Sequence, residues 1–269
     1  MPARLGQHFL KNDSAIKKII AALDIQPRET IIEIGPGKGA LTFPLVNECI
    51  QKKCQLMAIE KDIELVRNLE LKIKNSEYNN IKIISGDALK TLPDLIDNSQ
   101  LIIPNSNYKI VGNIPYYITG KLLRTISELK NKPSVSVLMV QKEVAERISG
   151  QPPHNNLLAS AMAIWATTEI ILNLKAKEFD PPPEVDSAVI RITTKKEQLA
   201  YQEIEKYYKM IHIIFKQPRK TLANNLKSGL DIPRVEIEKI LTSLDLPLNS
   251  RPQDISAEQV LKISKLSNI

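Results

Sequence analysis

Short apolar runs alternate with amphipathic stretches of helical period through the first half of the chain. The runs are rich in Ile, Val and Leu, which is typical of strands that are buried on both faces. We predict strands at residues 30–35, 55–60, 81–85, 109–113 and 135–140, and helices at residues 41–51, 63–74 and 119–129. Because strands and helices alternate, the pattern predicts a mostly parallel sheet with helices on both faces.

The pattern changes in the second half of the chain. Residues 156–165 favour a helix, and two β-rich stretches, 168–174 and 188–193, flank three consecutive prolines. Two late strands of this kind predict an antiparallel hairpin at the edge of the sheet. From residue 194 onward only helical patterns follow, at residues 198–216, 218–228, 234–244 and 257–266. We therefore expect a Rossmann-like α/β domain over residues 1–193 and a small all-helical domain over residues 194–269.

The charge of the chain suggests a polyanionic partner. The formal net charge is +7 and the pI is about 9.2. Residues 194–269 carry 13 Lys and Arg against 9 Asp and Glu, so more than half of the excess lies in the predicted helical domain. A basic surface attracts the phosphates of nucleic acid, and we expect RNA contacts there, although a solvated helical cap is the alternative.

Composition argues against several other classes of protein. The two cysteines, Cys49 and Cys54, form no CxxC pair, and the three histidines show no HExxH pattern, so we expect no metal. No stretch reaches the roughly 20 apolar residues of a membrane span, and the N-terminus lacks the apolar core of a signal peptide. We expect a cytoplasmic protein without a membrane association, and a monomer.

A glycine-rich turn follows the first predicted strand and predicts a nucleotide-type ligand. Gly35, Gly37 and the glycine after them let the backbone approach a ligand closely. Glu60 ends the second strand, where an acid can accept hydrogen bonds from ribose hydroxyls. Asp87 follows the third strand, with Ala88 beside it, where a carboxylate can accept from an adenine amine. Strand ends of an open α/β sheet meet at one edge, so these groups point to one adenosine-containing ligand.

The spacing of this turn favours S-adenosylmethionine over a dinucleotide. The turn has the sequence GPGKG rather than GxGxxG. Glu33, two residues before the first glycine, adds an acid that can hold the turn or the amino group of the ligand.

The fourth predicted strand ends in Asn113, Ile114, Pro115 and Tyr116, and this segment carries the candidate chemistry. The exocyclic amine of adenine is a poor nucleophile because its lone pair is delocalised into the ring. The Asn113 side-chain carbonyl and the Ile114 backbone carbonyl can accept hydrogen bonds from its protons. Pro115 restricts the backbone, and Tyr116 offers a face on which the base can stack. A base within a helix cannot reach such a pocket, so it must be single-stranded or flipped out.

At these motifs the chain resembles the small-subunit (16S) rRNA adenine N6-dimethyltransferases of the KsgA/RsmA type. The resemblance covers nearly the whole chain and is carried by the segments LGQHFL from Leu5, IEIGPGKGALT, GDAL, GNIPYYIT, QKEVAERI, FDPPPEVDSAV and FKQPRKTL. The chain departs from the family at Ile114, where leucine is frequent, and after residue 148, where a YGxLSV-like stretch is usual.

The resemblance implies the fold, the cofactor, the target and further site residues. It implies an S-adenosylmethionine enzyme that dimethylates two adjacent adenosines near the 3′ end of 16S rRNA. His8 and Leu10, together with Gly35, Glu60, Asp87 and Asn113, would contact the cofactor. Phe179 would face Tyr116 across the flipped adenine, although an aromatic plug before a proline turn is the alternative. Arg219 and Lys220 would contact RNA phosphates.

Two other functions fit the same fold. One is an erythromycin-resistance type methyltransferase, which applies the same chemistry to an adenine of 23S rRNA. The other is a ribosome assembly factor that binds RNA without catalysis. Asn113, Glu60 and Asp87 are all present, which disfavours the second alternative.

Overall fold

The computed structural model describes residues 8–76, 78–97, 107–197, 199–230 and 232–266. Two compact units make up the chain. The sheet unit comprises Met1–Ala145 and Glu169–Thr194, and the helical unit comprises Glu146–Thr168 and Lys195–Ile269. The segment Leu5–Gln7 of the family-like N-terminal motif lies outside the described residues.

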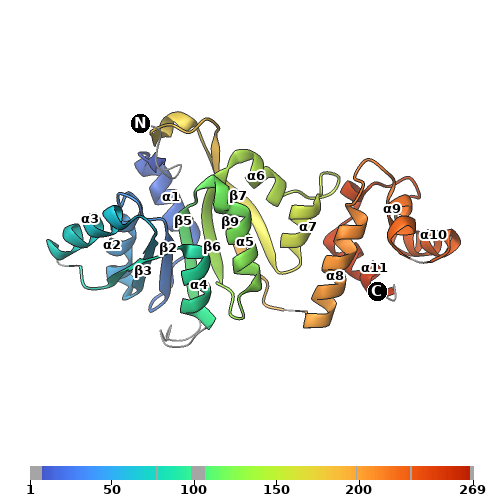
Figure 1. Cartoon of the computed structure of the whole chain (residues 1–269), viewed down its shortest axis with the longest axis horizontal. Coiled ribbons are helices and arrows are strands. Elements are labelled where there is room, and N and C mark those ends of the chain that lie inside the picture. The colour runs from blue at the N-terminus through green and yellow to red at the C-terminus, as the bar shows by residue number, and fades with distance from the viewer. Residues whose placement is uncertain (1–7, 77, 98–106, 198, 231, 267–269) are drawn as a thin grey trace. The chain divides into compact units, whose positions relative to one another are not determined.

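In the described part of the chain, seven strands form one sheet in the order β4-β3-β2-β5-β6-β9-β7 (Figure 1). The strands are β2 (Thr30–Ile34), β3 (Gln55–Glu60), β4 (Ile81–Ser85), β5 (Tyr108–Asn113), β6 (Val135–Gln141), β7 (Ala166–Leu174) and β9 (Ser187–Thr194). The strands from β4 to β6 are parallel, and β9 runs antiparallel to β6. The predicted fold class, a mostly parallel sheet with later strands at one edge, is confirmed.

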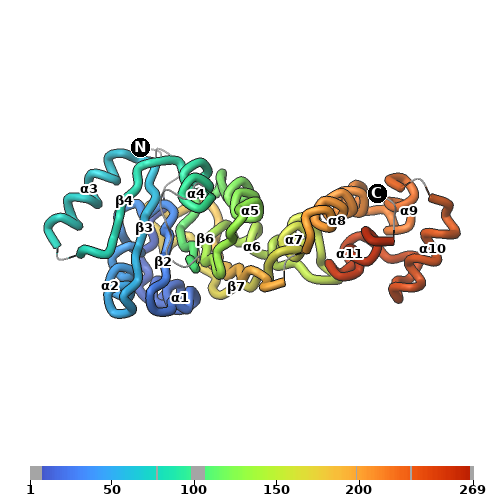
Figure 2. The backbone as a smooth tube through the Cα atoms, turned by 90° about the horizontal axis from the view of Figure 1, so that it is seen from below, coloured from blue at the N-terminus to red at the C-terminus, as the bar shows by residue number. Residues whose placement is uncertain are grey.

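Helices cover both faces of this sheet (Figure 2). Helices α1 (Asp13–Leu23) and α2 (Thr42–Lys52) lie on one face, where their apolar side chains form a core with Ile31, Leu56 and Val111 of the strands. Helices α4 (Ala88–Asp97) and α5 (Thr119–Glu128) pack together on the other face. Helix α3 (Ile63–Lys74) packs on β3 and β4, and α6 (Lys142–Ile148) begins in the sheet unit and ends in the helical unit.

A separate two-stranded sheet fixes the chain just before α1. Strand β1 (Phe9–Leu10) pairs antiparallel with β8 (Phe179–Asp180), with Leu10 opposite Phe179. The Lys11 backbone N–H extends this pairing by donating to the Glu178 carbonyl over 2.9 Å. Asn12 then caps α1 by accepting from the Ala15 N–H. This pairing places the N-terminal segment beside the loop that carries the three prolines.

The helical unit contains α7 (Leu157–Ala163), α8 (Tyr201–Ile214), α9 (Leu222–Gly229), α10 (Arg234–Ser243) and α11 (Ala257–Leu266). Its core is apolar and is contributed by the helices from α8 to α11. Helix α7 belongs to it because the Tyr207 hydroxyl donates to the Ser160 carbonyl over 2.9 Å. The Asn155 amide likewise donates to the Ile255 carbonyl over 2.7 Å. The predicted domain boundary at residue 194 therefore does not separate the two units, because residues 146–168 pack with the C-terminal helices.

Helix α9 begins later than the sequence pattern predicts. Its first residue is Leu222, not Pro218, because the Thr221 side chain caps the helix by accepting from the Asn224 N–H. Residues 216–220 consequently form an exposed loop. No helix in the described residues combines the length and apolar character that a bilayer span requires.

A buried ion pair lies at the amino-terminal ends of the strands. The Lys109 ammonium lies 2.9 Å from the Glu29 carboxylate, and the two side chains are only 5% and 4% exposed. Lys109 also donates to the Asp24 carbonyl over 2.5 Å, and Glu29 accepts from the Asn107 amide over 2.8 Å. The pair thereby connects the end of α1 with the starts of β2 and β5.

We predict that Lys109→Met lowers the free energy of unfolding by about 3–5 kcal/mol, because it leaves the Glu29 charge buried without its partner. Denaturant titration measures this loss. Arg124→Ala is the matched control, since the Arg124–Glu128 pair has side chains 80% and 62% exposed, and should leave stability almost unchanged. Equal losses in the two variants would contradict the structural importance of the buried pair.

Candidate active site

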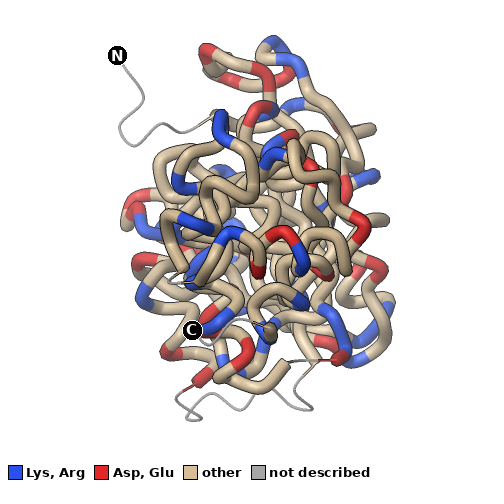
Figure 3. The backbone as a smooth tube through the Cα atoms, turned by 90° about the vertical axis from the view of Figure 1, so that its right-hand side faces the viewer, with Lys and Arg blue, Asp and Glu red and all other residues tan. Residues whose placement is uncertain are grey.

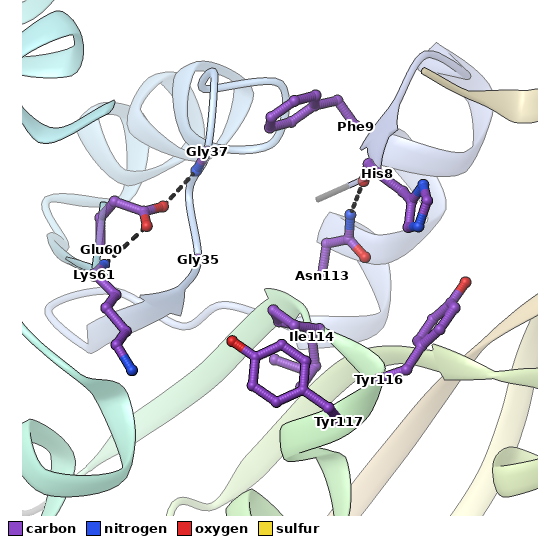
Figure 4. Close-up of a pocket in the computed structure, with 11 residues that line it drawn as sticks. His8, Phe9, Gly35, Gly37, Glu60, Lys61, Asn113, Ile114, Tyr116 and Tyr117 are labelled. Carbon is purple, nitrogen blue, oxygen red and sulfur yellow. Dashed lines mark hydrogen bonds between the residues drawn. The ribbon is translucent and has the colours of Figure 1, made fainter. Parts of the chain in front are cut away.

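The carboxyl ends of β2, β3 and β5 meet at one edge of the sheet and line a cavity (Figure 4). Because these strands are parallel neighbours, Gly35, Glu60 and Asn113 come together there. The cavity is open to solvent, and its empty space, counted together with that open solvent, is about 640 Å³. Its lining residues are His8, Phe9, Gly35, Gly37, Glu60, Lys61, Asn113, Ile114, Pro115, Tyr116 and Tyr117.

The glycine turn depends on backbone conformations that favour glycine. Gly35 and Gly37 have φ angles of +68° and +58°. A Cβ on Gly37 would lie 2.7 Å from the Phe9 ring, so a larger residue would push that ring aside. The turn is therefore shaped both by its own φ angles and by the aromatic ring that covers it.

Glu60 fastens the turn to the end of β3. One carboxylate oxygen, Oε2, accepts the Gly37 N–H over 3.0 Å, while Oε1 accepts the N–H groups of Lys61 and Asp62 over 2.8 and 2.9 Å. Each carboxylate oxygen has two lone pairs, so Oε2 retains capacity for another donor. This arrangement suits a ribose hydroxyl, as the sequence predicts.

Asp87 lies beside this cavity and is engaged by Lys61. Its Oδ2 is 2.9 Å from the Lys61 ammonium, and its Oδ1 accepts the Leu89 N–H over 3.0 Å. The hydrogen bond from Lys61 holds the pKa of Asp87 below its usual value. Ala88 is buried at the first position of α4. Lys61 lines the cavity, and sequence reasoning missed it, although it directly follows Glu60.

A second cavity adjoins the first and contains the other predicted acid. It is lined by Leu10 and Glu33 among others, and it shares Phe9, Gly35 and Asn113 with the first cavity. Glu33 is 1% exposed, and its Oε2 has no hydrogen-bond partner. Burial raises the pKa of Glu33 to about 8, and the nearby Glu60 charge adds to the effect. An unpartnered buried carboxyl oxygen fits the ammonium group of a methionine moiety.

Asn113 is held in one orientation by the N-terminal segment. Its Nδ2 donates to the His8 carbonyl over 2.6 Å. A carbonyl oxygen can only accept, which identifies the nitrogen side of the amide. The Asn113 oxygen therefore points away from His8 O, on the side of the Tyr116 ring (Figure 4). Ile114 follows with its N–H bonded to the Met139 carbonyl over 3.1 Å, and Pro115 leads into a 3₁₀ turn (Tyr116–Ile118).

Tyr116 faces His8, and Phe179 lies elsewhere. The Tyr116 hydroxyl is 2.8 Å from the Ser187 hydroxyl, and its ring is stacked against the His8 ring with centroids 6.1 Å apart. Phe179 is 2% exposed and belongs to the apolar core with Leu10 and the residues of α1. It is absent from the lining of both cavities described above.

The basic pair Arg219 and Lys220 occupies the exposed loop of residues 216–220 in the helical unit. Asn225, which is 1% exposed, holds this loop by accepting the Gln217 N–H over 2.9 Å and by donating to the Gln217 and Thr221 carbonyls over 3.0 and 3.1 Å. Sequence reasoning missed Asn225, because nothing in the pattern around it indicates a buried amide. Elsewhere along the backbone, Lys and Arg are interspersed with Asp and Glu (Figure 3). Positive charge alone therefore does not distinguish this loop, whereas its hydrogen bonds with Asn225 do.

Three features define the class of this protein. They are a glycine turn that a ligand can approach closely, a carboxylate suited to a ribose hydroxyl, and an adjoining buried carboxyl group suited to an ammonium group. The protein is an S-adenosylmethionine-dependent methyltransferase. The family model described as ribosomal RNA adenine dimethylase matches residues 2–268. The chain belongs to the ribosomal RNA adenine dimethylase family.

Similar proteins agree with this family over nearly the full chain. A ribosomal RNA small subunit methyltransferase A of Dehalococcoides mccartyi strain BAV1 is 36% identical over 261 residues, covering 96% of this chain and 86% of the relative. The protein of the same name from Clostridium botulinum strain Kyoto is 34% identical over 264 residues, covering 97% and 91%.

Two solved structures share the fold. The 23S rRNA methyltransferase ErmE has a TM-score of 0.78 at 23% identity, covering 97% of this chain and all of that one. A dimethyladenosine transferase from Plasmodium falciparum has a TM-score of 0.77 at 24% identity, covering 95% and 96%. Identities this low support the fold alone.

We predict that Glu33→Gln flattens the pH dependence of stability. The folded state holds a proton on Glu33 up to about pH 8, whereas the unfolded chain releases it near 4.5. The wild type therefore loses stability as the pH rises between these values, by up to about 1.4 kcal/mol per pH unit, and the variant lacks this slope. Denaturant titrations at several pH values measure it. Glu70→Gln, a change of an exposed residue on α3, should keep the wild-type slope, and a shared slope in all three proteins would disprove the assignment.

Proposed function

We propose that this enzyme transfers methyl groups to the N6 amines of two adjacent adenosines near the 3′ end of 16S rRNA. The fixed amide of Asn113 is the observation that carries the proposal. Its oxygen is held beside the aromatic ring of Tyr116 and next to the cofactor cavity, where an acceptor for an amine proton is required. The relatives at 34% and 36% identity bear a small-subunit name, which favours this target over 23S rRNA.

The proposed chemistry is alignment of the amine with the methyl donor. S-adenosylmethionine supplies an activated methyl on its sulfonium when bound. The Asn113 Oδ1 and the Ile114 carbonyl accept the two amine protons, which draws the nitrogen toward tetrahedral geometry and frees its lone pair. Tyr116 stacks on the flipped base. The proton that leaves after methyl transfer passes to water, so no general base is needed.

In the second methylation the enzyme makes one hydrogen bond fewer to the amine of the base. A monomethylated amine has one remaining proton, so only one of the two acceptors, Asn113 or Ile114, can be used. The pocket must also admit the first methyl group. We propose that the Asn113 oxygen serves both steps, because its orientation is fixed by His8.

We propose these roles for the other predicted residues. The cofactor would be held by His8, Leu10, Glu33, Gly35, Gly37, Glu60, Asp87, Ala88 and Asn113. In this scheme the adenine amine of the cofactor donates to the remaining lone pair of the Asp87 Oδ2, beside the Lys61 ammonium. The helical unit would bind rRNA through Arg219 and Lys220, and the protein would act as a cytoplasmic monomer.

Parallel methylation assays test the target. Labelled S-adenosylmethionine is offered with undermethylated small subunits, large subunits and free rRNA, and the modified nucleotide is mapped. We expect N6,N6-dimethyladenosine near the 3′ end of 16S rRNA. Label confined to 23S rRNA would favour the erythromycin-resistance type of activity, and absence of label despite cofactor binding would favour an assembly factor.

We predict that Asn113→Ala lowers turnover at least a hundredfold, as removal of one transition-state acceptor commonly does. Cofactor affinity should change by less than about tenfold, or 1.4 kcal/mol, because the glycine turn and Glu60 remain. Single-turnover methylation and calorimetric binding separate the two effects. Asn68→Ala on the exposed side of α3 is the control. Wild-type turnover in the Asn113 variant would remove this residue from the mechanism.

We predict that reversing charge at Arg219 and Lys220, as Arg219→Glu with Lys220→Glu, weakens rRNA binding and makes it less dependent on salt. Each lost phosphate contact reduces the slope of log K against log salt by roughly 0.7–0.9. Binding titrations at several salt concentrations measure the slope. The pair Lys17→Glu and Lys18→Glu on the exposed side of α1 changes the net charge equally. An equal change of slope in this control would show a general charge effect rather than loop contacts.

A further inference from the structure

A buried amide in the helical unit binds the backbone of the exposed loop, residues 216–220. Asn225 is 1% exposed, and its Oδ1 accepts the Gln217 N–H over 2.9 Å. Its Nδ2 carries two hydrogens and donates to the Gln217 carbonyl over 3.0 Å and to the Thr221 carbonyl over 3.1 Å. One side chain therefore holds both backbone polar groups of Gln217 and the backbone of the residue that follows the loop.

Gln217 is also the first residue of a tight turn. The Lys220 N–H donates to the Gln217 carbonyl over 3.0 Å, which closes a β-turn over residues 217–220. Pro218 takes the second position of this turn, where proline is favoured because its ring fixes φ. The turn ends at Thr221, whose side chain caps α9. The backbone of the turn is thus fixed at its start by Asn225 and at its end by the beginning of a helix.

The side chains on this fixed backbone are exposed and mostly cationic. Lys216, Arg219 and Lys220 all lie on the exposed surface. The sequence contains no acid between Glu205 and Asp231, so no carboxylate follows or precedes the loop closely along the chain. Several cations within five residues attract a polyanion such as the phosphate backbone of RNA.

A fixed backbone lowers the free-energy cost of binding a phosphate. A mobile loop loses conformational entropy when it binds, and this loss subtracts from the affinity. In this protein the hydrogen bonds of Asn225 order the turn before any ligand arrives. The interaction with RNA therefore does not have to supply the free energy of ordering the turn.

We infer that Asn225 is a positioning residue for RNA binding, which holds residues 217–220 in the conformation from which Arg219 and Lys220 bind phosphates. This inference rests on the proposed function, which assigns Arg219 and Lys220 to rRNA. It adds that the affinity of these two side chains depends on a buried amide that does not itself contact the RNA.

Substitution of Asn225 tests the inference in the full chain. Asn225→Ala removes its hydrogen bonds to the turn and should weaken binding of undermethylated 16S rRNA about tenfold, or 1.4 kcal/mol, which is the order of the entropy cost of fixing one residue. The slope of log K against log salt should fall by roughly 0.7–0.9, as for one lost phosphate contact. Asn225→Ser keeps a hydroxyl that can bond to one backbone group, so its effect should be smaller, and it carries the test if Asn225→Ala does not fold.

Leu226→Ala is the matched control for loss of stability. Leu226 is also 1% exposed and lies on the same helix, but its side chain belongs to the apolar core. The variant should lower the melting temperature at least as much as Asn225→Ala does, and should leave rRNA binding by the folded protein as in the wild type. Equal losses of rRNA affinity in Leu226→Ala and Asn225→Ala, measured well below both melting temperatures, would overturn the inference.

A double-mutant cycle identifies the side chains through which Asn225 acts. Arg219→Ala combined with Lys220→Ala should weaken rRNA binding by the wild type. The same pair should weaken binding by a smaller factor in the Asn225→Ala background, because the released turn no longer presents these cations. A purely destabilising role of Asn225 would not produce this coupling. Equal factors in the two backgrounds would overturn the inference.

Failure of the proposed function gives a different result. If Arg219→Ala with Lys220→Ala leaves rRNA affinity and its salt slope unchanged, the proposed phosphate contacts are wrong and the inference falls with them. If that pair weakens binding while Asn225→Ala and Asn225→Ser bind as the wild type does, only the inference is overturned. If the wild type methylates only 23S rRNA, the cycle is measured with that RNA, and coupling or its absence decides in the same way.

Discussion

The proposed active site depends on one hydrogen bond, from the Asn113 amide to the His8 carbonyl. A side-chain amide at the end of a strand is otherwise free to rotate and can present either its oxygen or its nitrogen. This bond ties the nitrogen to the N-terminal segment, so the oxygen remains available as an acceptor. The pairing of β1 with β8 keeps that segment in place. The orientation of the Asn113 oxygen at the end of β5 is thus fixed by residues more than 100 positions away in sequence.

The two acids of the ligand site differ in their hydrogen-bond partners. Glu60 accepts three backbone N–H groups and fastens the glycine turn. Glu33, in the adjoining cavity, is buried with an unpartnered oxygen, and its pKa is raised to about 8. A cationic ligand would reverse this by favouring the charged carboxylate. In the proposed function Glu33 would therefore link cofactor binding to proton release, while Glu60 holds the glycine turn without the ligand.

Local patterns were sufficient to predict the sheet and the edge at which the glycine turn and the strand-end acids meet. Apolar runs identify β2 to β6, and glycines and acids at strand ends meet because parallel strands end together. Long-range contacts were not predictable. The two-residue strands β1 and β8 are too short to show a period, and their pairing decides that His8 meets Tyr116 while Phe179 enters the core. The late start of α9 follows from the Thr221 cap, and the grouping of residues 146–168 with the helices follows from contacts such as Tyr207 with Ser160.

A crystal structure with a bisubstrate ligand, in which the N6 atom of adenosine is joined to a cofactor analogue, tests the role of Asn113. We expect N6 to lie within hydrogen-bond distance of the Asn113 Oδ1, with the Asn113 Nδ2 still bonded to the His8 carbonyl. A bound ligand whose N6 lies beyond 4 Å from the Asn113 oxygen, or an amide turned so that its nitrogen faces N6, would contradict it.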